Sequence, residues 1–573
     1  MTWYDNAPGR LESELASLEA AGFAFVLDEK EREDRRVIQV HVETEIDGVG
    51  CTLVATYPDE FPYFKPHVAG PNLGFHHHFN PATNEYCLLQ SGAGAWRPSD
   101  TLAALLREQI PKFVAANTVQ TEASEILDLE VAQAEPFSCY VEPANHEELM
   151  VVPTDLSRQD LLSGRAALIY TSADPLRGHV VELVANGQSL SKTSTPPRHL
   201  PDAAFGSVII PWVHLESPPE SVDSGAWWRA VEGVLTDIPA VDAPPARPPG
   251  NVRKNRQIVL VGFPEEVGHR SVGQGWIVLI RERQRVHKPW TAERTIRVEQ
   301  AGHLDLFLRE PRLRSIASSK IMLVGLGGLG GWLAQYLATM SPQKIVYVDG
   351  DIGSAATAIR NPGAFRKAGR PKATEAVRAT VETQPYTEPF GILHRIGAPR
   401  TSLLDAPGGS DMDTLGSALD DVDLIIDATA DLSAQHYLSD QARSRDIAYI
   451  RAEALPGVWS GIVAIQHPDT EACWMCWQHH LTDTIPALPE DSDPAVQPPG
   501  CGDPTYTGTA FDLAAIASQA ARFAASYLTG PDGYGHTSTN LATVRFRSDT
   551  GDLVLPAWTG YELGKHPSCP NHQ

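Results

Sequence analysis

Three consecutive histidines stand nine to eleven residues ahead of a cysteine in the segment 75-FHHHFNPATNEYCLLQ-90. A cysteine in such a setting is either a metal ligand or a nucleophile whose thiolate attacks an acyl carbon. His76, His77 and His78 are adjacent and do not easily converge on one ion, since the ligands of a catalytic zinc usually come from separate elements. The segment therefore favours Cys87 as a nucleophile, with metal binding as the alternative.

A second group of residues has the spacing of a nucleotide site. The run 320-KIMLVGLGGLGGWLAQYLA-338 places Gly325, Gly327 and Gly330 in the pattern G-x-G-x-x-G, after an apolar strand and at the start of a helix. Such glycines let backbone N–H groups approach phosphates at a helix N-terminus. Asp349, at the end of the next expected strand, suits a ribose hydroxyl. By itself the pattern is shared with dinucleotide-binding dehydrogenases.

The composition narrows the class of protein. The chain has 573 residues, too many for one hydrophobic core, and about three to four domains are expected. Its net charge of −25 disfavours non-specific nucleic-acid binding. The first residues show no basic segment followed by an apolar run, and no window approaches 18 uninterrupted apolar residues, so we expect neither a secretory signal nor a membrane span. Seven cysteines, an odd number, suit thiol or metal chemistry in a reducing cytoplasm better than a disulfide framework.

Three domains must position these residues. Residues 1–142 have the pattern of a small α+β domain, with strand-like runs before the Cys87 loop and a capped helix after it. Residues 143–305 carry short β-type runs and no catalytic constellation, and we interpret them as a β-rich spacer domain. In residues 306–573 strands alternate with helices, which predicts a mostly parallel, Rossmann-like sheet covered by helices.

The segment 347-YVDGDIGSAATAIRNPGAFRKAGRPKATEA-376 resembles the ThiF-type adenylation domain of ubiquitin-activating enzymes and of the bacterial adenylyltransferases of thiamine and molybdopterin biosynthesis. The resemblance implies binding of ATP and Mg²⁺, with cations that neutralise charge on the transferring α-phosphate. The positions that match the family's nucleotide-binding residues are Asp349, Asp351, Arg360 and Lys372.

This segment and its surroundings also depart from the family's pattern. The family's asparagine falls on Thr357. Its strand-end D-x-x-D-N reads Asp427-Ala-Thr-Ala-Asp431, so we expect Asp431 to hold magnesium, with Asp427 as the alternative. Arg309 stands where the family places a further ATP-contacting arginine.

The cysteines of this last domain follow the same resemblance. The pair 473-CWMC-476 has zinc spacing, and relatives often carry a structural zinc held by two such pairs. Here Cys473, Cys476, Cys569 and His572 would form a closed Cys₃His site; His566 is an alternative ligand, and the zinc-free reading is a pair of buried thiols.

Cys501 stands apart from the zinc-spaced cysteines. It follows a Pro-rich acidic loop and precedes a helix, where activating enzymes carry their catalytic cysteine. A thiolate near a helix start has a lowered pKa and is the better nucleophile. The alternative is an exposed loop cysteine.

The N-terminal domain resembles the ubiquitin-conjugating enzymes. Three segments match their landmarks in order: the proline-rich 57-YPDEFPYFKPHV-68, the active-site-like 78-HFNPATNEYCLL-89, and the helix-opening 96-WRPSDTLAALL-106. The resemblance implies a thioester on Cys87, an oxyanion hydrogen bond from Asn80 and a loop shaped by His78. Phe79 replaces the family's proline, and the spacing to the cysteine is one residue shorter.

The order of the domains resembles the bacterial fusions of a conjugating domain to an activating domain, as in anti-phage cyclic-oligonucleotide signalling (CBASS) operons. This implies adenylation of a protein C-terminus, a thioester on Cys501, transfer to Cys87 and conjugation to a target lysine. The donor would be a ubiquitin-like protein or a cyclic-oligonucleotide synthase, and the enzyme a homodimer. Two alternatives stay open: a sulfur-carrier adenylyltransferase, which would need Cys501 but not Cys87, and a non-catalytic scaffold.

Overall fold

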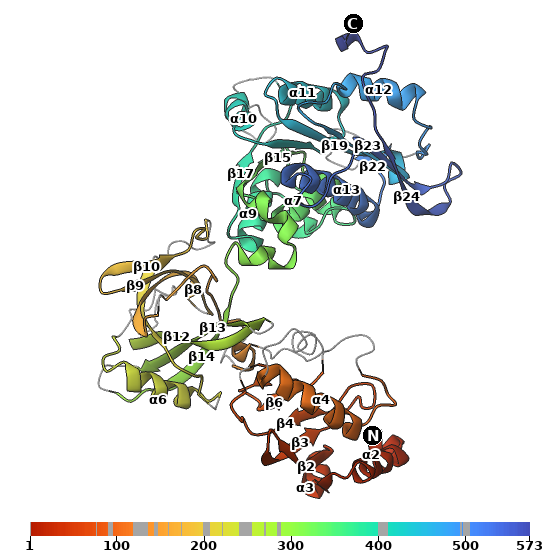
Figure 1. Cartoon of the computed structure of the whole chain (residues 1–573). Helices are drawn as coiled ribbons and strands as arrows, with labels where there is room; N and C mark the ends of the chain where they lie inside the picture. The colour runs from red at the N-terminus through yellow and green to blue at the C-terminus, as the bar shows by residue number, and fades with distance from the viewer. Residues whose placement is uncertain are drawn as a thin grey trace. The chain divides into compact units, whose positions relative to one another are not determined.

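A computed structural model describes most of the chain (Figure 1). The described residues are 2–75, 77–89, 96–118, 136–141, 147–158, 160–173, 175–198, 207–219, 222–239, 255–268, 271–283, 288–398, 411–492, 495–496 and 505–572. The chain divides into two compact units. One comprises Met1–Thr193 with Ala204–Gln300, and the other comprises Ser194–Ala203 with Ala301–Gln573.

The first unit begins with a six-stranded antiparallel sheet in the order β1-β2-β3-β4-β6-β5. Along β2 the buried Val40 and Val42 alternate with more exposed neighbours, because successive side chains of a strand point to opposite faces. The buried face packs against helices α2 and α4, which confirms the predicted α+β fold. The bounds are α1 Trp3–Asn6, α2 Pro8–Ala20, β1 Ala24–Leu27, α3 Glu29–Arg35, β2 Gln39–Ile46, β3 Val49–Thr56, β4 His67–Ala69, β5 Phe79–Asn80, β6 Glu85–Tyr86 and α4 Leu102–Thr118.

The same unit contains a second sheet that closes on itself, because β8 pairs with both β9 and β11. Its longest hairpin, β12–β13, is buried on both faces, as the apolar runs 258–261 and 277–280 predict. One face fills the interior, and the other lies under α6 and η1. The bounds are η1 Phe137–Tyr140, β7 Leu149–Val151, β8 Ser163–Ala173, β9 Leu176–Ala185, β10 Gln188–Lys192, β11 Ser207–His214, α6 Ser224–Val234, β12 Asn255–Gly268, β13 Ser271–Arg283 and β14 Ala292–Glu299.

The second unit is built on an eight-stranded sheet in the order β17-β16-β15-β18-β19-β20-β23-β24. The first five strands in this order, from β17 through β16, β15 and β18 to β19, are parallel to one another. The last three, β20, β23 and β24, pair antiparallel. The Rossmann-like fold is thus confirmed, and three antiparallel strands extend its parallel part into a mixed sheet. The bounds are β15 Lys320–Val324, β16 Lys344–Val348, β17 Glu388–Ile392, β18 Leu424–Asp427, β19 Ala448–Ala454, β20 Ser460–Gln466, β23 Leu541–Arg547 and β24 Leu553–Tyr561.

Helices cover both faces of this mixed sheet (Figure 1). On one face α7, α9 and α13 bury Leu333, Ala373 and Ile516; on the other α10, α11 and α12 bury Leu415, Leu438 and Trp477. The bounds of the helices are η3 Asp305–Arg309, η4 Pro311–Ser318, α7 Gly328–Thr339, η5 Ala355–Thr357, α8 Ala364–Lys367, α9 Lys372–Thr383, α10 Met412–Leu419, α11 Leu432–Arg443, η6 Pro456–Val458, α12 Trp474–Asp483, α13 Ala510–Thr529 and η7 Pro570–His572. Two short strands, β21 Ala495–Val496 and β22 Thr505–Tyr506, pair with each other. In the described part of the chain, no helix is both long and apolar enough to cross a membrane.

Candidate functional site

The glycine-rich turn joins β15 to α7 and has two positions that require glycine. Gly325 has a φ of +85°, and a Cβ on it would meet the backbone of Ala428 at 2.9 Å. A Cβ on Gly330 would lie 1.8 Å from the Gly325 carbonyl oxygen, so only glycine lets the helix approach the turn so closely. Gly327 caps the helix and has open space beside it. The turn therefore leaves the N-terminal N–H groups of α7 available to a phosphate.

Register brings three strand ends to the edge of the sheet that carries this turn. Val324 of β15 pairs with Val348 of β16 on one side and with Asp427 of β18 on the other. In parallel α/β sheets ligands bind outside the carboxyl ends of the strands. Asp349 and Asp427 therefore belong to the edge that the sequence pattern indicated.

The Asp349 carboxylate forms hydrogen bonds to two backbone segments at this edge. One carboxylate oxygen accepts the Leu326 N–H at 2.7 Å, and the other accepts the Asp351 N–H at 2.7 Å. Burial raises the pKa of Asp349, while Lys372, 3.9 Å away, opposes that shift. The Lys372 amine lies 2.8 Å from Asp351 Oδ2. The structure thus groups Asp349, Asp351 and Lys372 beside the glycine turn, as predicted from spacing.

Arg360 lies over the start of α7. A Cβ on Gly328 would lie 3.5 Å from the Arg360 side-chain stem, and the guanidinium donates to the Tyr506 carbonyl in β22. The predicted cation therefore lies close to the N-terminus of α7, the end of a helix that favours anions.

Asn361 is a residue that the sequence reasoning missed. Its Nδ2 donates to the Gly327 carbonyl at 3.2 Å, and its Oδ1 is buried without a hydrogen-bond partner among the described residues. Thr357, on which the family's asparagine was placed, instead bonds locally to the Ser354 carbonyl. An asparagine directly after the predicted Arg360, on the same turn, was the available signal.

The two candidate magnesium ligands have different surroundings. Asp427 is buried; Thr429 donates to its Oδ1 and the Tyr449 hydroxyl donates to its Oδ2 at 3.0 Å. Burial, only partly offset by these bonds, raises the pKa of Asp427 to about 6. Asp431 is exposed at the start of α11 and uses one oxygen, Oδ1, to cap the Ala434 N–H at 2.8 Å. The geometry favours Asp431 as the metal ligand.

Among the described residues, one predicted site residue, Arg309, is not brought to this edge. Arg309 is exposed at the end of η3 and, within the described residues, forms no hydrogen bond or ion pair with the nucleotide-site group. Cys501, the predicted first nucleophile, lies outside the described residues. Its role stays a prediction from the sequence.

Four candidate zinc ligands converge as the sequence predicts. The ligand atoms of Cys473, Cys476, Cys569 and His572 all lie within 4.8 Å of one another. The Sγ of Cys473 is 3.8 Å from that of Cys476 and 3.6 Å from that of Cys569. The Nε2 of His572 is buried with no hydrogen-bond partner among the described residues. Three thiols and one unsatisfied imidazole nitrogen fit a closed zinc site.

His566, the alternative ligand, belongs to a neighbouring group. Its Nε2 lies 3.0 Å from Asp483 Oδ2, and its Nδ1 accepts the Ser568 N–H at 3.1 Å. His480, the third member of this group, contacts the Gly564 carbonyl through Nε2 at 3.0 Å. These nitrogens already have hydrogen-bond partners in the protein, so His572, not His566, is the histidine that completes the thiol cluster.

In the first unit, Cys87 follows a small hairpin made by β5 and β6. Phe79 pairs with Tyr86 and Asn80 with Glu85, and the Cys87 N–H donates to the His78 carbonyl at 2.8 Å. Phe79 and Tyr86 are buried with ring centroids 5.7 Å apart, which fixes the hairpin on the core. The thiol of Cys87 is half-buried. The hairpin thus holds the predicted nucleophile at the end of an anchored strand.

Asn80 is oriented by the turn of this hairpin. The side chain is 2% exposed, and its Oδ1 accepts the Ala82 N–H at 2.9 Å. His78 is fully buried with a φ of +57°. His76 lies outside the described residues.

The other two landmarks of the N-terminal domain meet in space. The Trp96 indole donates to the Pro62 carbonyl at 2.8 Å and lies beside the ring of Phe61. Behind them, the buried Glu14 accepts from the Tyr57 hydroxyl and from the N–H of Leu102 at the start of α4. These contacts explain why three segments spaced along the sequence act as one structural unit.

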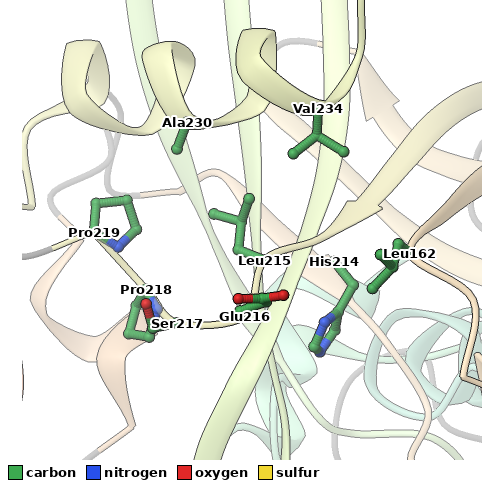
Figure 2. Close-up of a pocket in the computed structure, with 9 residues that line it drawn as sticks. All are labelled: Leu162, His214, Leu215, Glu216, Ser217, Pro218, Pro219, Ala230 and Val234. Carbon is green, nitrogen blue, oxygen red and sulfur yellow. The ribbon is translucent and has the colours of Figure 1, made fainter.

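A hollow of about 510 Å³ opens on the closed sheet, between the end of β11 and α6 (Figure 2). His214, Leu215 and Glu216 line it from below, and Ala230 and Val234 of α6 from above. Burial lowers the pKa of His214 to about 4. None of the predicted site residues lines this hollow.

Comparison with known proteins identifies a family for each of the two regions that carry these residues. Residues 299–569 match the ThiF family, and residues 17–150 match prokaryotic E2 family B. The uncharacterized protein y4oA of Sinorhizobium fredii (strain NBRC 101917 / NGR234) is 26% identical over 99% of this chain and 97% of its own. The uncharacterized protein y4qC of the same strain is 26% identical over 97% of this chain and 95% of its own.

Among solved structures, E. coli MccB with MccA-N7isoASN is 14% identical, with a TM-score of 0.33, over 45% of this chain and 68% of its own. PaaA is 16% identical, with a TM-score of 0.30, over 44% of this chain and 66% of its own. The two family matches, which coincide with the two sites described above, show that this chain fuses a prokaryotic E2-like region to a ThiF-type, E1-like adenylation domain.

Proposed function

We propose that this protein activates the C-terminus of a partner protein with ATP and passes it, through two cysteine thioesters, to an amine. The observation that carries the proposal is the presence in one chain of a ThiF-type glycine turn with its cations and of an E2-like hairpin that ends at Cys87. A simple adenylyltransferase would need only the first.

The first step is adenylation, and the ThiF family uses ATP. The N–H groups of the glycine turn face the phosphates, and Asp349 accepts from the ribose. Lys372 and Arg360 would offset charge on the α-phosphate, and Asp431 would hold Mg²⁺. A carboxylate oxygen of the partner attacks the α-phosphorus, and pyrophosphate leaves.

Two thioesters follow. The Cys501 thiolate attacks the acyl carbon and AMP leaves; the Cys87 thiolate then attacks that thioester and the Cys501 thiolate leaves. An amine attacks the Cys87 thioester, loses a proton and forms an amide as the Cys87 thiolate leaves. Asn80 Oδ1 accepts the Ala82 N–H, which leaves its Nδ2 as the group that donates to the oxyanion in this proposal. His78 shapes the loop that carries the thiol.

The Cys₃His cluster would hold a structural zinc, since four protein ligands leave no open position for substrate. The zinc would then join Cys473 and Cys476, at the start of α12, to Cys569 and His572. The zinc would stabilise this end of the adenylation domain.

The acyl donor in this proposal is a ubiquitin-like protein or a cyclic-oligonucleotide synthase, and the acceptor is a lysine of a target protein. The order of the domains supports an anti-phage signalling setting. We further propose a homodimer, in which the exposed Arg309 serves the nucleotide site of the partner copy.

The test is a covalent trap. In Cys87→Ser a labile thioester becomes a stable oxyester, so the full chain purified from its native host should carry a protein joined through its C-terminus to residue 87. Denaturing gels and mass spectrometry detect and identify it. Cys139→Ser, the same change at an exposed cysteine, is the matched control and should carry no adduct.

Adding Cys501→Ala to Cys87→Ser should abolish the adduct, because the acyl group reaches Cys87 through Cys501. If Cys87→Ser carries no adduct while the protein still turns over ATP with host extract, conjugation is excluded. An adduct that persists without Cys501 would contradict acyl transfer through Cys501, but it would still show that position 87 accepts the acyl group.

A further inference from the structure

The closed middle sheet, interpreted from sequence as a spacer, contacts the Cys87 hairpin through Glu266 of β12. Glu266 Oε2 accepts the His78 N–H at 2.9 Å, although the two residues are 188 positions apart. Glu266 Oε1 lies 3.7 Å from His77 Nδ1 and 3.9 Å from His78 Nδ1. The Glu266 side chain is only 4% exposed, so a buried carboxylate of the middle sheet faces both histidines.

The backbone of His78 links Glu266 to Cys87 through two hydrogen bonds. Its N–H is held by Glu266, and its carbonyl accepts the Cys87 N–H at 2.8 Å. His78 has a φ of +57°, a conformation that a non-glycine residue keeps only when its surroundings hold it. The two backbone hydrogen bonds supply that restraint on either side of the same residue.

Two further contacts hold the hairpin in place. Ala82, in its turn, packs against the core cluster of the middle sheet that contains Phe137 and Phe263. On the other side, Asn117 of α4 receives the His77 N–H and donates to the His77 carbonyl, both at 3.0 Å. The Cys87 strand is thus clamped between its own helix and the middle sheet.

We propose that Glu266 is a positioning residue for Cys87: the middle sheet fixes the thiol for acyl transfer through Glu266 and the His78 backbone. The purpose of this contact rests on the proposed function, but the contact itself can be tested without it. The middle sheet is then a working part of the conjugating site rather than a spacer.

The test uses backbone hydrogen–deuterium exchange of the full chain, which requires no acyl donor. Glu266→Ala removes the acceptor, so the His78 and Cys87 amides should exchange at least about 10-fold faster. Glu266→Gln keeps an acceptor oxygen at the same reach and should exchange within about 3-fold of the native protein. Glu293→Ala, at an exposed glutamate of β14 in the same sheet, is the matched control and should change neither amide.

Glu266→Asp guards against failure of the alanine variant to fold. It keeps the charge but shortens the side chain by one methylene, so it should lose protection at His78 and Cys87 that Glu266→Gln retains. Equal protection in the aspartate and glutamine variants, or unchanged exchange in Glu266→Ala, would overturn the positioning role.

The consequence for catalysis is measured in the Cys87→Ser background. Glu266→Ala should reduce the rate of adduct formation about 10-fold or more, and Glu266→Gln should restore it. Faster amide exchange without any adduct in the parent trap would contradict the proposed conjugation but keep the Glu266 contact. An adduct formed at full rate in Glu266→Ala would contradict the positioning role and keep conjugation.

Discussion

The Tyr449 hydroxyl donates a hydrogen bond to Asp427 Oδ2 at 3.0 Å, inside the core of the adenylation domain. Thr429 donates to the other oxygen, Oδ1, so both oxygens of the buried Asp427 have partners within the protein at the end of β18. Asp431, four residues on, is left as the exposed carboxylate of this turn.

Asp431→Asn should therefore weaken the magnesium dependence of ATP binding. The amide keeps an oxygen for the Ala434 N–H and so preserves the helix cap, but it loses the charge that a divalent ion needs. We expect the Mg²⁺ concentration for half-maximal ATP binding to rise about 10-fold. Asp427→Asn is the matched control: it should alter the unfolding transition and leave the magnesium dependence unchanged. The reverse pattern would assign the ion to Asp427.

Lys372→Ala should reduce the affinity for ATP. Lys372 begins α9 beside Asp349 and Asp351. Hydrogen bonds from a charged group contribute about 1.5–3 kcal/mol, which corresponds to about 10- to 150-fold in the dissociation constant. Titration calorimetry with ATP and Mg²⁺ measures it. Lys344→Ala removes a lysine at the opposite end of β16, where it pairs with Asp421, and should bind ATP normally. Equal loss in both variants would indicate general damage instead of a phosphate contact.

The zinc content of the protein should depend on His572 and not on His566. The native protein should contain about one zinc per chain by elemental analysis, and Cys569→Ser or His572→Ala should lower that content and the melting temperature by several degrees. His566→Ala disturbs only the bond to Asp483 and should keep its zinc. Zinc retained in Cys569→Ser would exclude the Cys₃His cluster as the site.

Glu265, next to Glu266 on β12, should make the first unit less stable as pH rises. Burial raises the pKa of Glu265 to about 7, against a smaller lowering by the Phe137 N–H. A raised pKa means that the folded state binds the proton more tightly. Its stabilising effect is complete below the unfolded value of 4.5 and is lost as pH rises to about 7.

Glu265→Gln, which cannot ionise, should therefore gain stability relative to the native protein between pH 5 and pH 8. The upper bound is about 3 kcal/mol, from roughly 1.36 kcal/mol per pKa unit. Urea unfolding at both pH values measures the change, and taking the difference between the two proteins cancels the titration of other groups. The same difference at both pH values would show that Glu265 has an ordinary pKa.

The local patterns of the sequence predicted much of the two sites. Glycine spacing located the turn at Gly325, because the tight turn and the close helix approach are properties of neighbouring residues. The zinc-spaced cysteines and the segment around Cys87 were likewise readable, since one helical turn or one hairpin sets the separation of their side chains.

The tertiary structure decided what depends on residues far apart in the chain. Whether Asp427 or Asp431 is available for an ion depends on Tyr449 and on burial. The choice of His572 over His566 depends on Asp483, and the support of Cys87 depends on Glu266 of another sheet. The antiparallel strands β20, β23 and β24 are fixed by pairing across the sheet. Spacing determines which groups lie on one element, whereas packing of distant elements determines which polar atoms are already satisfied and which remain for chemistry.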